Sequence, residues 1–360
     1  MFLPNRYASG IEFSQKSLGD RYYLDLIRGN GERSNVLVIT FFAFGMVNPR
    51  TIQMDEPWAF NFVRSQGVSV LGVKPATADW YRGEELHRYF RSAEFSDLAA
   101  SFDRVIFYGT SMGAYAGLVF SQALPSADVI SLNPQTTLDT RIVPWEPRFK
   151  VGQEQDWDGD FNDGATTVER TGKVYVTYDP FFMLDRRHVE RLPASGMVLL
   201  KVPMVGHSTA VWLTKMGLLK GLFIDILNDT FNADAFHRSV RKRRDIAHYY
   251  LEMARCAGGR RAEVRRWCLA KAETMAEDDA SAYLEIAALH EKNADFASAE
   301  QVLFHLRTVR PNLPHAPYQL SRLMRRQHRL GEALEYAQTA LSIAPKNAVY
   351  QDWLVSLQTA

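Results

Sequence analysis

The first 225 residues alternate short, continuously apolar runs with helix-sized segments, as at 58–66 and 112–123. The apolar runs are rich in β-branched and aromatic residues, for example VLVITFF, VSVLGV and RVIFYG. Such runs are typical of strands buried on both faces of a sheet. The alternation predicts an α/β fold with a mostly parallel sheet, begun by an antiparallel pair at the N-terminus. The eight predicted strands are 11–14, 22–28, 35–42, 68–73, 104–109, 129–132, 173–178 and 197–202.

The pattern changes after Lys220, and from Asp245 onward Ala, Leu, Glu, Arg and Gln recur with apolar residues at helical spacing. The segment also repeats itself at a period of 34 residues. The matching pairs are Ala299 and Ala333, Pro311 and Pro345, Leu284 and Tyr318, and Phe296 and Leu330. This period resembles the tetratricopeptide repeat. It implies an all-α helical-repeat domain with units at 279–312 and 313–346, after a degenerate helix pair at 245–257 and 262–276.

We therefore expect three parts: an α/β domain over 1–230, a basic linker over 231–244 and the helical repeats over 245–360. The linker contains the run RSVRKRR at 238–244. A patch for phosphate or anionic lipid is one interpretation of this run. The preferred interpretation is a solvated helix start at a domain junction.

Composition narrows the function classes further. The 42 basic and 41 acidic side chains give a formal net charge of +1, which offers no electrostatic reason to expect a nucleic acid partner. The N-terminus lacks the apolar stretch of a signal peptide, and no run is long enough to span a bilayer. Two cysteines, Cys256 and Cys268, build no disulfide framework. We expect a cytoplasmic protein with no transmembrane segment, metal or cofactor.

The chemistry-bearing motif is Gly109-Thr110-Ser111-Met112-Gly113, between a predicted buried strand and an Ala/Gly-rich helix. This G-x-S-x-G pattern places a serine on a sharp turn, where a side chain at either glycine would be too crowded. The positive end of the following helix favours an oxyanion. Over residues 10–225 the sequence resembles the α/β-hydrolase superfamily. The alternative is an ordinary Gly-Ser turn in a nucleotide-binding fold.

This resemblance implies Ser111 as a nucleophile that needs a base. His207, in the sequence VGHS just past the last predicted strand, stands where the superfamily carries its catalytic histidine. The other histidines of this half, His87 and His188, lie in predicted helices.

The superfamily order also implies an acid between the serine and the histidine. Asp179 directly follows the seventh predicted strand and is the preferred residue. Asp185 is its rival, although its position before a helical segment also suits a helix N-cap.

The same resemblance places the oxyanion hole in two backbone N–H groups. The first belongs to Met112, the residue after the nucleophile. The second comes from the loop after the third strand, where Phe42 is preferred and Ala43 is nearly as good. Many relatives carry His-Gly at this loop, and this chain does not.

Candidate substrate contacts come from other segments of the chain. The long segment 134–172 is expected to form a lid, whose aromatic residues either contact an acyl chain or sugar ring or anchor the loop. Its acidic stretch at 156–163 is interpreted as a solvated turn rather than a calcium loop, since it lacks the EF-hand glycine and glutamate. Asp79-Trp80-Tyr81 and Asn133-Pro134-Gln135 follow two strands and are further candidates to line a pocket.

The predicted function is a serine hydrolase that cleaves a small-molecule or carbohydrate ester through an acyl-enzyme. One alternative is a thioesterase or acyltransferase with the same triad. Another is a non-catalytic docking module, because repeat stacks offer concave binding surfaces. The repeats are expected to bind a protein partner or mediate self-association, and an equal alternative is that they form a domain that stabilises its neighbour.

Overall fold

The computed structural model describes residues 12–257 and 261–359. Its contacts divide the chain into two compact units, residues 1–241 and 242–360. The N-terminal residues considered for a signal peptide lie outside the described residues, as does the first residue of the predicted strand 11–14. Among the helices described, none has the length and apolar character needed to cross a bilayer.

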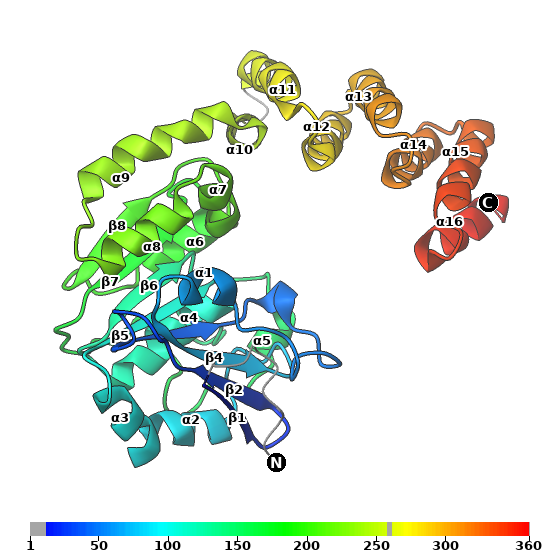
Figure 1. Ribbon diagram of the computed structural model, residues 1–360. Coiled ribbons are helices and arrows are strands. Elements are labelled where there is room, and N and C mark those ends of the chain that lie inside the picture. The colour runs from blue at the N-terminus through cyan, green and yellow to red at the C-terminus, as the bar shows by residue number, and fades with distance from the viewer. Residues whose placement is uncertain (1–11, 258–260, 360) are drawn as a thin grey trace. The chain divides into compact units, whose positions relative to one another are not determined.

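The first unit is built on one eight-stranded sheet with the order β1-β2-β4-β3-β5-β6-β7-β8 (Figure 1). β2 pairs antiparallel with β1 and β4, and the other pairings are parallel. The predicted α/β-hydrolase fold and its antiparallel start are thus confirmed. The strands are β1 Phe13–Leu18, β2 Tyr22–Ile27, β3 Val36–Phe41, β4 Ser69–Pro75, β5 Arg104–Thr110, β6 Asp128–Leu132, β7 Val174–Tyr178 and β8 Met197–Lys201.

Helices connect the parallel strands and cover the sheet. The predicted basic linker is itself largely helical, since it contains α9 and a 3₁₀ helix over Val240–Asp245. The α-helices of this unit are α1 Phe60–Arg64, α2 Glu84–Arg91, α3 Ala93–Ala100, α4 Met112–Phe120, α5 Lys150–Gln153, α6 Met183–Val189, α7 Thr209–Lys215, α8 Leu219–Leu227 and α9 Ala233–Ser239. Short 3₁₀ helices span Phe44–Met46 and Ser121–Ala123.

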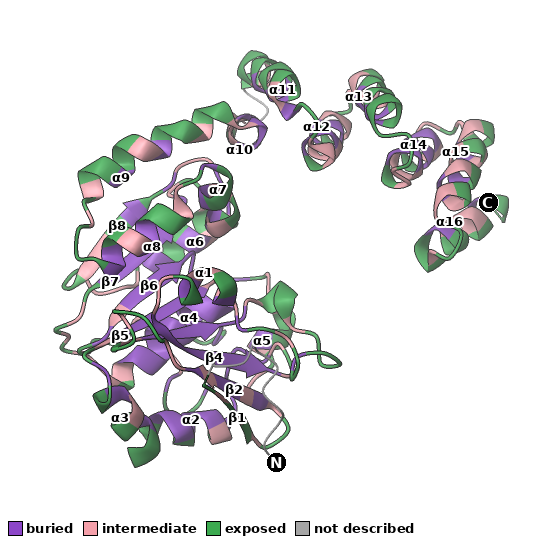
Figure 2. Cartoon of the chain, viewed as in Figure 1, coloured by how far each residue is buried: buried purple, intermediate pink, exposed green. Residues whose placement is uncertain are grey.

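The core centres on the strands that carry the serine turn, and Figure 2 shows these central strands buried along their lengths. Phe41 of β3 stacks on Phe107 of β5 and Phe120 of α4, at ring-centroid distances of 6.2 and 6.0 Å. Each fully buried phenylalanine contributes about 1.5–3 kcal/mol through the hydrophobic effect. This packing fixes the β5–α4 connection against the middle of the sheet.

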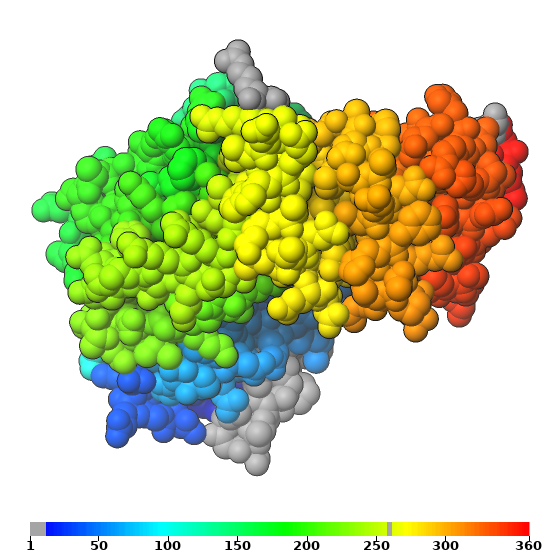
Figure 3. All heavy atoms as spheres, turned by 90° about the horizontal axis from the view of Figure 1, so that it is seen from above, coloured from blue at the N-terminus to red at the C-terminus, as the bar shows by residue number. Residues whose placement is uncertain are grey.

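The second unit is a stack of helices, as the 34-residue period predicted. Its helices follow one another in chain order, and Figure 3 shows the atoms of this unit changing in the same order from yellow to red. The repeat-matched Ala299 and Ala333 are both buried in the packing of successive helices. One further helix, α16, follows the predicted units. The helices are α10 Ala247–Ala257, α11 Ala262–Ala276, α12 Ala280–Lys292, α13 Phe296–Val309, α14 His315–Arg326, α15 Leu330–Ile343 and α16 Ala348–Gln358.

Candidate active site

Ser111 occupies a strained turn between β5 and α4. Its backbone angles are φ 54° and ψ −118°, a region that a non-glycine residue adopts only when its surroundings enforce it. The surroundings are crowded as predicted. A Cβ at Gly109 would lie 2.2 Å from the carbonyl oxygen of Gly113, and a Cβ at Gly113 would lie 2.6 Å from that of Phe41. The two glycines therefore allow the backbone contacts that hold Ser111 in its strained conformation.

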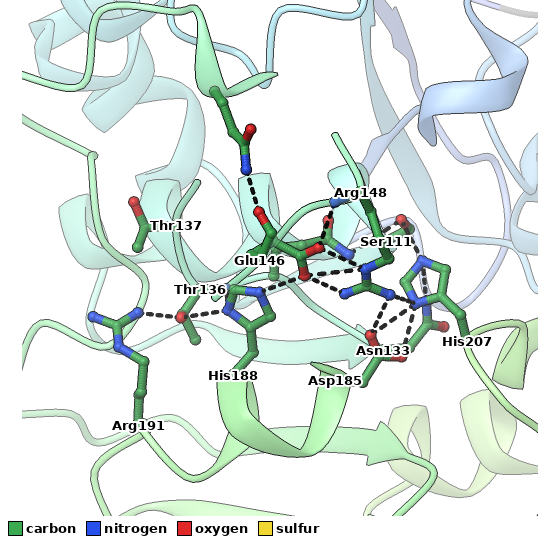
Figure 4. A network of polar contacts seen from close by, with 12 residues as sticks. Ser111, Asn133, Thr136, Thr137, Glu146, Arg148, Asp185, His188, Arg191 and His207 are labelled. Atoms are coloured by element: carbon green, nitrogen blue, oxygen red, sulfur yellow. Dashed lines mark hydrogen bonds and ion pairs between the residues drawn. The ribbon is translucent and has the colours of Figure 1, made fainter. Parts of the chain in front are cut away.

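The structure brings Ser111 and His207 together. Ser111 Oγ lies 3.0 Å from His207 Nε2, as Figure 4 shows. His207 stands in the turn between β8 and α7, and its side chain is 26% exposed. The rings of Phe149 and Phe182 flank its imidazole at centroid distances of 6.0 and 6.2 Å. The predicted nucleophile and base are thus within hydrogen-bond reach.

The carboxylate beside the imidazole belongs to Asp185 and not to the preferred Asp179. His207 Nδ1 lies 2.7 Å from Asp185 Oδ2 and 2.9 Å from Oδ1 (Figure 4). Asp179 instead accepts backbone N–H groups from Val205 and Gly206, each at 2.8 Å. It thereby fixes the loop that carries His207, which explains an aspartate at that position without contact to the imidazole.

The helix N-cap interpretation of Asp185 is wrong. Phe182 occupies the N-cap position of α6, and Asp185 lies within the first turn of the helix. Its side chain is fully buried, and the positive end of the helix favours a carboxylate there.

The hydrogen-bond roles follow from the chemistry of the partners. A carboxylate only accepts hydrogen bonds. His207 Nδ1 therefore carries the proton, and this N–H donates a hydrogen bond to Asp185. Nε2 is then left to accept from the hydroxyl of Ser111. This is the arrangement in which an imidazole can take the proton of a serine as it attacks.

The two residues predicted to supply oxyanion donors, Met112 and Phe42, directly follow Ser111 and β3, respectively. Met112 is the first residue of α4, where backbone N–H groups have no partner within the helix. Phe42 directly follows β3, and its carbonyl accepts the hydroxyl of Tyr81 at 2.9 Å. Ala43, the alternative donor, lines the pocket next to Ser111.

A pocket of about 590 Å³ opens over Ser111 and His207. This volume is in the range of small-molecule sites. Among the described residues, those that line it carry no Asp, Glu, Lys or Arg. They are Ala43, Phe44, Gly45, Met46, Trp58, Thr110, Ser111, Asn133, Phe149, His207, Ser208, Ala210, Val211, Thr214 and Leu219.

The structure distinguishes the two strand-end segments that were candidates to line the pocket. Asn133 lines the pocket, and its Nδ2 lies 3.4 Å from both ring nitrogens of His207. Gln135 is fully buried, with its Nε2 3.5 Å from Ser111 Oγ. Trp80 and Tyr81 are instead buried in the hydrophobic core.

The segment 134–172 contributes residues that sequence reasoning missed. Phe149 lines the pocket, and Arg148 Nη1 lies 2.8 Å from Asp185 Oδ1 and 3.2 Å from His207 Nδ1. Glu146 pairs with Arg148. The unusual length of this segment was the available signal, but nothing in its sequence singles out these residues. Its aromatic residues Trp157 and Phe161 pack against the core.

The acidic stretch 156–163 is organised by a buried arginine. The guanidinium of Arg82 donates to the backbone carbonyls of Asp156, Asp158, Asp160 and Phe161 at 2.7–3.0 Å. These carbonyl oxygens face a cation supplied by the chain itself. Within the described residues, no group of three or more His, Cys, Asp or Glu side chains is placed to hold a metal ion.

No protein-family profile and no curated protein sequence matches this chain. Among solved structures, it is similar to a capsule O-acetyltransferase of Neisseria meningitidis serogroup A (14% identity, 61% of this chain and 100% of that chain, TM-score 0.40). It is also similar to acetyl xylan esterase 1 of Thermoanaerobacterium sp. JW/SL YS485 (16% identity, 60% of this chain and 85% of that chain, TM-score 0.39).

A third similar structure is the APC/C hetero-tetramer Cut9-Hcn1 (14% identity, 41% of this chain, TM-score 0.30). This chain spans about a third of that one, 32% of its length. At these TM-scores it is the strand order and the Ser111 turn, not the likenesses, that identify the fold of the first unit.

Proposed function

We propose that this protein is a serine hydrolase that cleaves ester bonds, with Ser111 as nucleophile, His207 as general base and Asp185 as the acid of the triad. One observation carries the proposal. A continuous hydrogen-bonded series runs from Asp185 through His207 to Ser111, with separations of 2.7 and 3.0 Å, and ends on a strained turn that lines a pocket. Strain and preorganisation of this kind concentrate at active sites.

The reaction follows from the roles of these groups. The oxygen of Ser111 attacks the ester carbonyl carbon while His207 Nε2 takes its proton, and Asp185 stabilises the imidazolium. The backbone N–H of Met112 and one from Phe42 or Ala43 stabilise the tetrahedral oxyanion. The imidazolium then gives its proton to the leaving alkoxide. The alcohol departs, and the acyl group remains on Ser111 as an acyl-enzyme. Water, activated by the same imidazole, releases the acid and restores the serine.

The pocket lining favours substrates whose bound part is uncharged. Trp58, Phe149 and Leu219 offer apolar contact, and an unpaired charge in such a site is costly to desolvate. We expect nitrophenyl butyrate to be hydrolysed faster than nitrophenyl hemisuccinate, which has a similar chain ending in a carboxylate. A preference for the hemisuccinate would refute this assignment of the pocket.

The decisive test of the enzyme class is covalent labelling. A fluorophosphonate probe should label the wild-type chain, and Ser111→Ala should abolish labelling. Ser101→Ala is a matched control, because Ser101 lies at the exposed C-terminal end of α3. An unlabelled wild-type chain would refute the hydrolase proposal and favour a docking role. Product analysis with added alcohols and thiols then separates hydrolysis from acyl transfer.

We further propose that the helical repeats bind a protein partner or a second copy of this chain. Exposed apolar side chains on their helices support this, including Trp267 on α11 and Val349 and Val355 on α16. Sedimentation velocity of the full chain over a range of concentrations tests self-association. A concentration-independent monomer would exclude the second copy as the occupant.

A further inference from the structure

Arg148 lies against the acid and base of the proposed triad without being among the described residues that line the pocket. Its Nη1 donates to Asp185 Oδ1 at 2.8 Å and lies 3.2 Å from His207 Nδ1. Since Nδ1 and Nη1 are both N–H donors, the two groups converge on one carboxylate rather than bonding to each other. The rings of Phe149 and Phe182 enclose the guanidinium at 5.0 and 5.3 Å.

The position of Arg148 is set from its other side by Glu146. The Glu146 carboxylate accepts Arg148 Nε and Nη2, at 2.8 Å to Oε1 and 2.6 Å to Oε2, and the Arg148 backbone N–H at 2.9 Å. Two-point pairing of this kind fixes the plane of a guanidinium. Both Glu146 and Asp185 are fully buried at the side chain, while Arg148 is 17% exposed. Arg148 is therefore held rigidly between two buried carboxylates.

Glu146 is fixed in turn by His188, which shares helix α6 with Asp185. The Thr136 backbone N–H donates to His188 Nδ1 at 3.1 Å, so Nδ1 is unprotonated and Nε2 carries the hydrogen. Nε2 then donates to Glu146 Oε2 at 3.2 Å (Figure 4). Burial lowers the pKa of His188 and keeps it neutral in spite of Glu146. Asp185 and His188, three residues apart on α6, therefore both contact this network from one face of the helix.

The charges of this network explain why two carboxylates accompany one arginine. If Asp185 alone faced Arg148, the guanidinium would neutralise it and weaken its attraction for the imidazolium. Burial alone raises the pKa of Glu146, but hydrogen bonds from His188 and Arg148 outweigh it and hold that pKa at about 2, so Glu146 stays charged. With both carboxylates ionised, the Glu146–Arg148–Asp185 group keeps one net negative charge. That charge matches the imidazolium that forms during catalysis.

We infer that Glu146 and Arg148 form a charge-balanced clamp in which Arg148 is a positioning residue that orients the Asp185 carboxylate toward His207. The inference rests on the proposed hydrolase function. Arg148 fixes the geometry of Asp185, and Glu146 offsets the charge of Arg148 so that Asp185 remains an effective partner of the imidazolium. A lysine at 148 would keep the charge but lose the planar fork that contacts both carboxylates.

The test measures kcat and KM of the full-length protein on nitrophenyl butyrate, with active sites counted by fluorophosphonate titration. Arg148→Met should lower kcat per titrated site by about 10- to 100-fold, the effect of misplacing catalytic groups by up to an ångström. KM should stay unchanged, because Arg148 lies outside the pocket lining. Arg148→Lys should recover part of the loss, and Glu146→Gln should lower kcat while Arg148 remains.

Arg141 provides a matched control. It pairs with Asp139 through the same two-residue spacing and the same two-point contact, but its side chain is 63% exposed. Arg141→Met should leave kcat and KM at their wild-type values. A similar loss in Arg141→Met and Arg148→Met would mean that any broken arginine pair in this segment lowers activity, which would overturn the clamp.

Loss of folding is separated from loss of positioning by the double variant Glu146→Gln/Arg148→Met. It removes both charges together and so avoids leaving Glu146 buried without its cation, the costly outcome of the single change. We expect the double variant to melt closer to wild type than Arg148→Met but to keep the low kcat. Wild-type kcat per titrated site in either Arg148→Met or the double variant would overturn the clamp. An unlabelled, inactive wild-type chain would instead refute the hydrolase function on which it rests.

Discussion

Asp185→Asn is the substitution that most directly tests the proposed triad. In the folded chain Arg148 donates to Asp185 Oδ1, so an asparagine at 185 is held with its carbonyl oxygen toward the guanidinium. Its amide NH₂ then faces His207 Nδ1, 2.7 Å away in the present arrangement. Facing a donor, Nδ1 becomes the acceptor and the proton moves to Nε2. That tautomer points an N–H at Ser111 and cannot take the serine proton.

The expected loss is large because the wrong tautomer removes the general base. Loss of the orienting carboxylate in a serine triad lowers kcat by about 10⁴-fold. Asp185→Asn should therefore reduce kcat by about that factor, although the protein stays folded and keeps Ser111. The assay is steady-state hydrolysis of nitrophenyl butyrate, with circular dichroism to verify that the variant is folded.

Asp179→Asn is the matched comparison. Its carboxylate accepts N–H groups from Val205 and Gly206 through one oxygen and from Phe181 through the other. An amide supplies one acceptor oxygen instead of two, so at least one of these bonds is lost, at a cost of about 1.5–3 kcal/mol for a hydrogen bond to a charged group. We expect a lower melting temperature and a far smaller loss of kcat than in Asp185→Asn. The opposite ranking of the two kcat values would refute the assignment of Asp185.

Three further outcomes follow from the described contacts. Burial, aided by the charge of Arg82, lowers the pKa of His87 from 6.5 to about 4. On acidification the unfolded chain therefore binds a proton at His87 before the folded chain does. Between pH 6.5 and 4 the free energy of unfolding of the wild-type chain, measured by urea denaturation, should fall by about 3 kcal/mol more than that of His87→Gln. Gly113→Ala should lower both melting temperature and kcat, since its Cβ would lie 2.6 Å from the Phe41 carbonyl oxygen; unchanged activity would contradict the strained turn. Ala333→Phe should destabilise the helical repeats by about 1–3 kcal/mol through overpacking, seen as an earlier loss of helical circular dichroism.

The strands and the serine turn were predictable because their signals are local. Continuous apolar runs mark the buried strands, and all eight predicted strands overlap observed ones. The two glycines that the turn requires stand two residues to either side of Ser111, so the motif can be recognised without the backbone of Phe41 that crowds Gly113. The 34-residue period likewise marks repeated local packing, so the helical repeats were visible without any long-range contact.

The identity of the acid in the proposed triad does not follow from a local signal. Asp179 and Asp185 are six residues apart, and both follow β7, so the order of residues along the chain fits either. Only the path of the chain after β7 decides between them. It turns into α6, which carries Asp185 to His207, while Asp179 stays at the strand end and binds the loop before His207.

The sequence by itself therefore determined the α/β fold, the serine turn, the helical repeats and the candidate base, because each follows from periodicity or from a short motif. Tertiary structure alone decided that Asp185 contacts His207 and that Glu146 and Arg148 lie beside them. These groups come from segments up to 96 residues from Ser111 and meet through packing rather than through any spacing along the chain. A side chain's partner is set by where its backbone is carried, and no local pattern encodes that path.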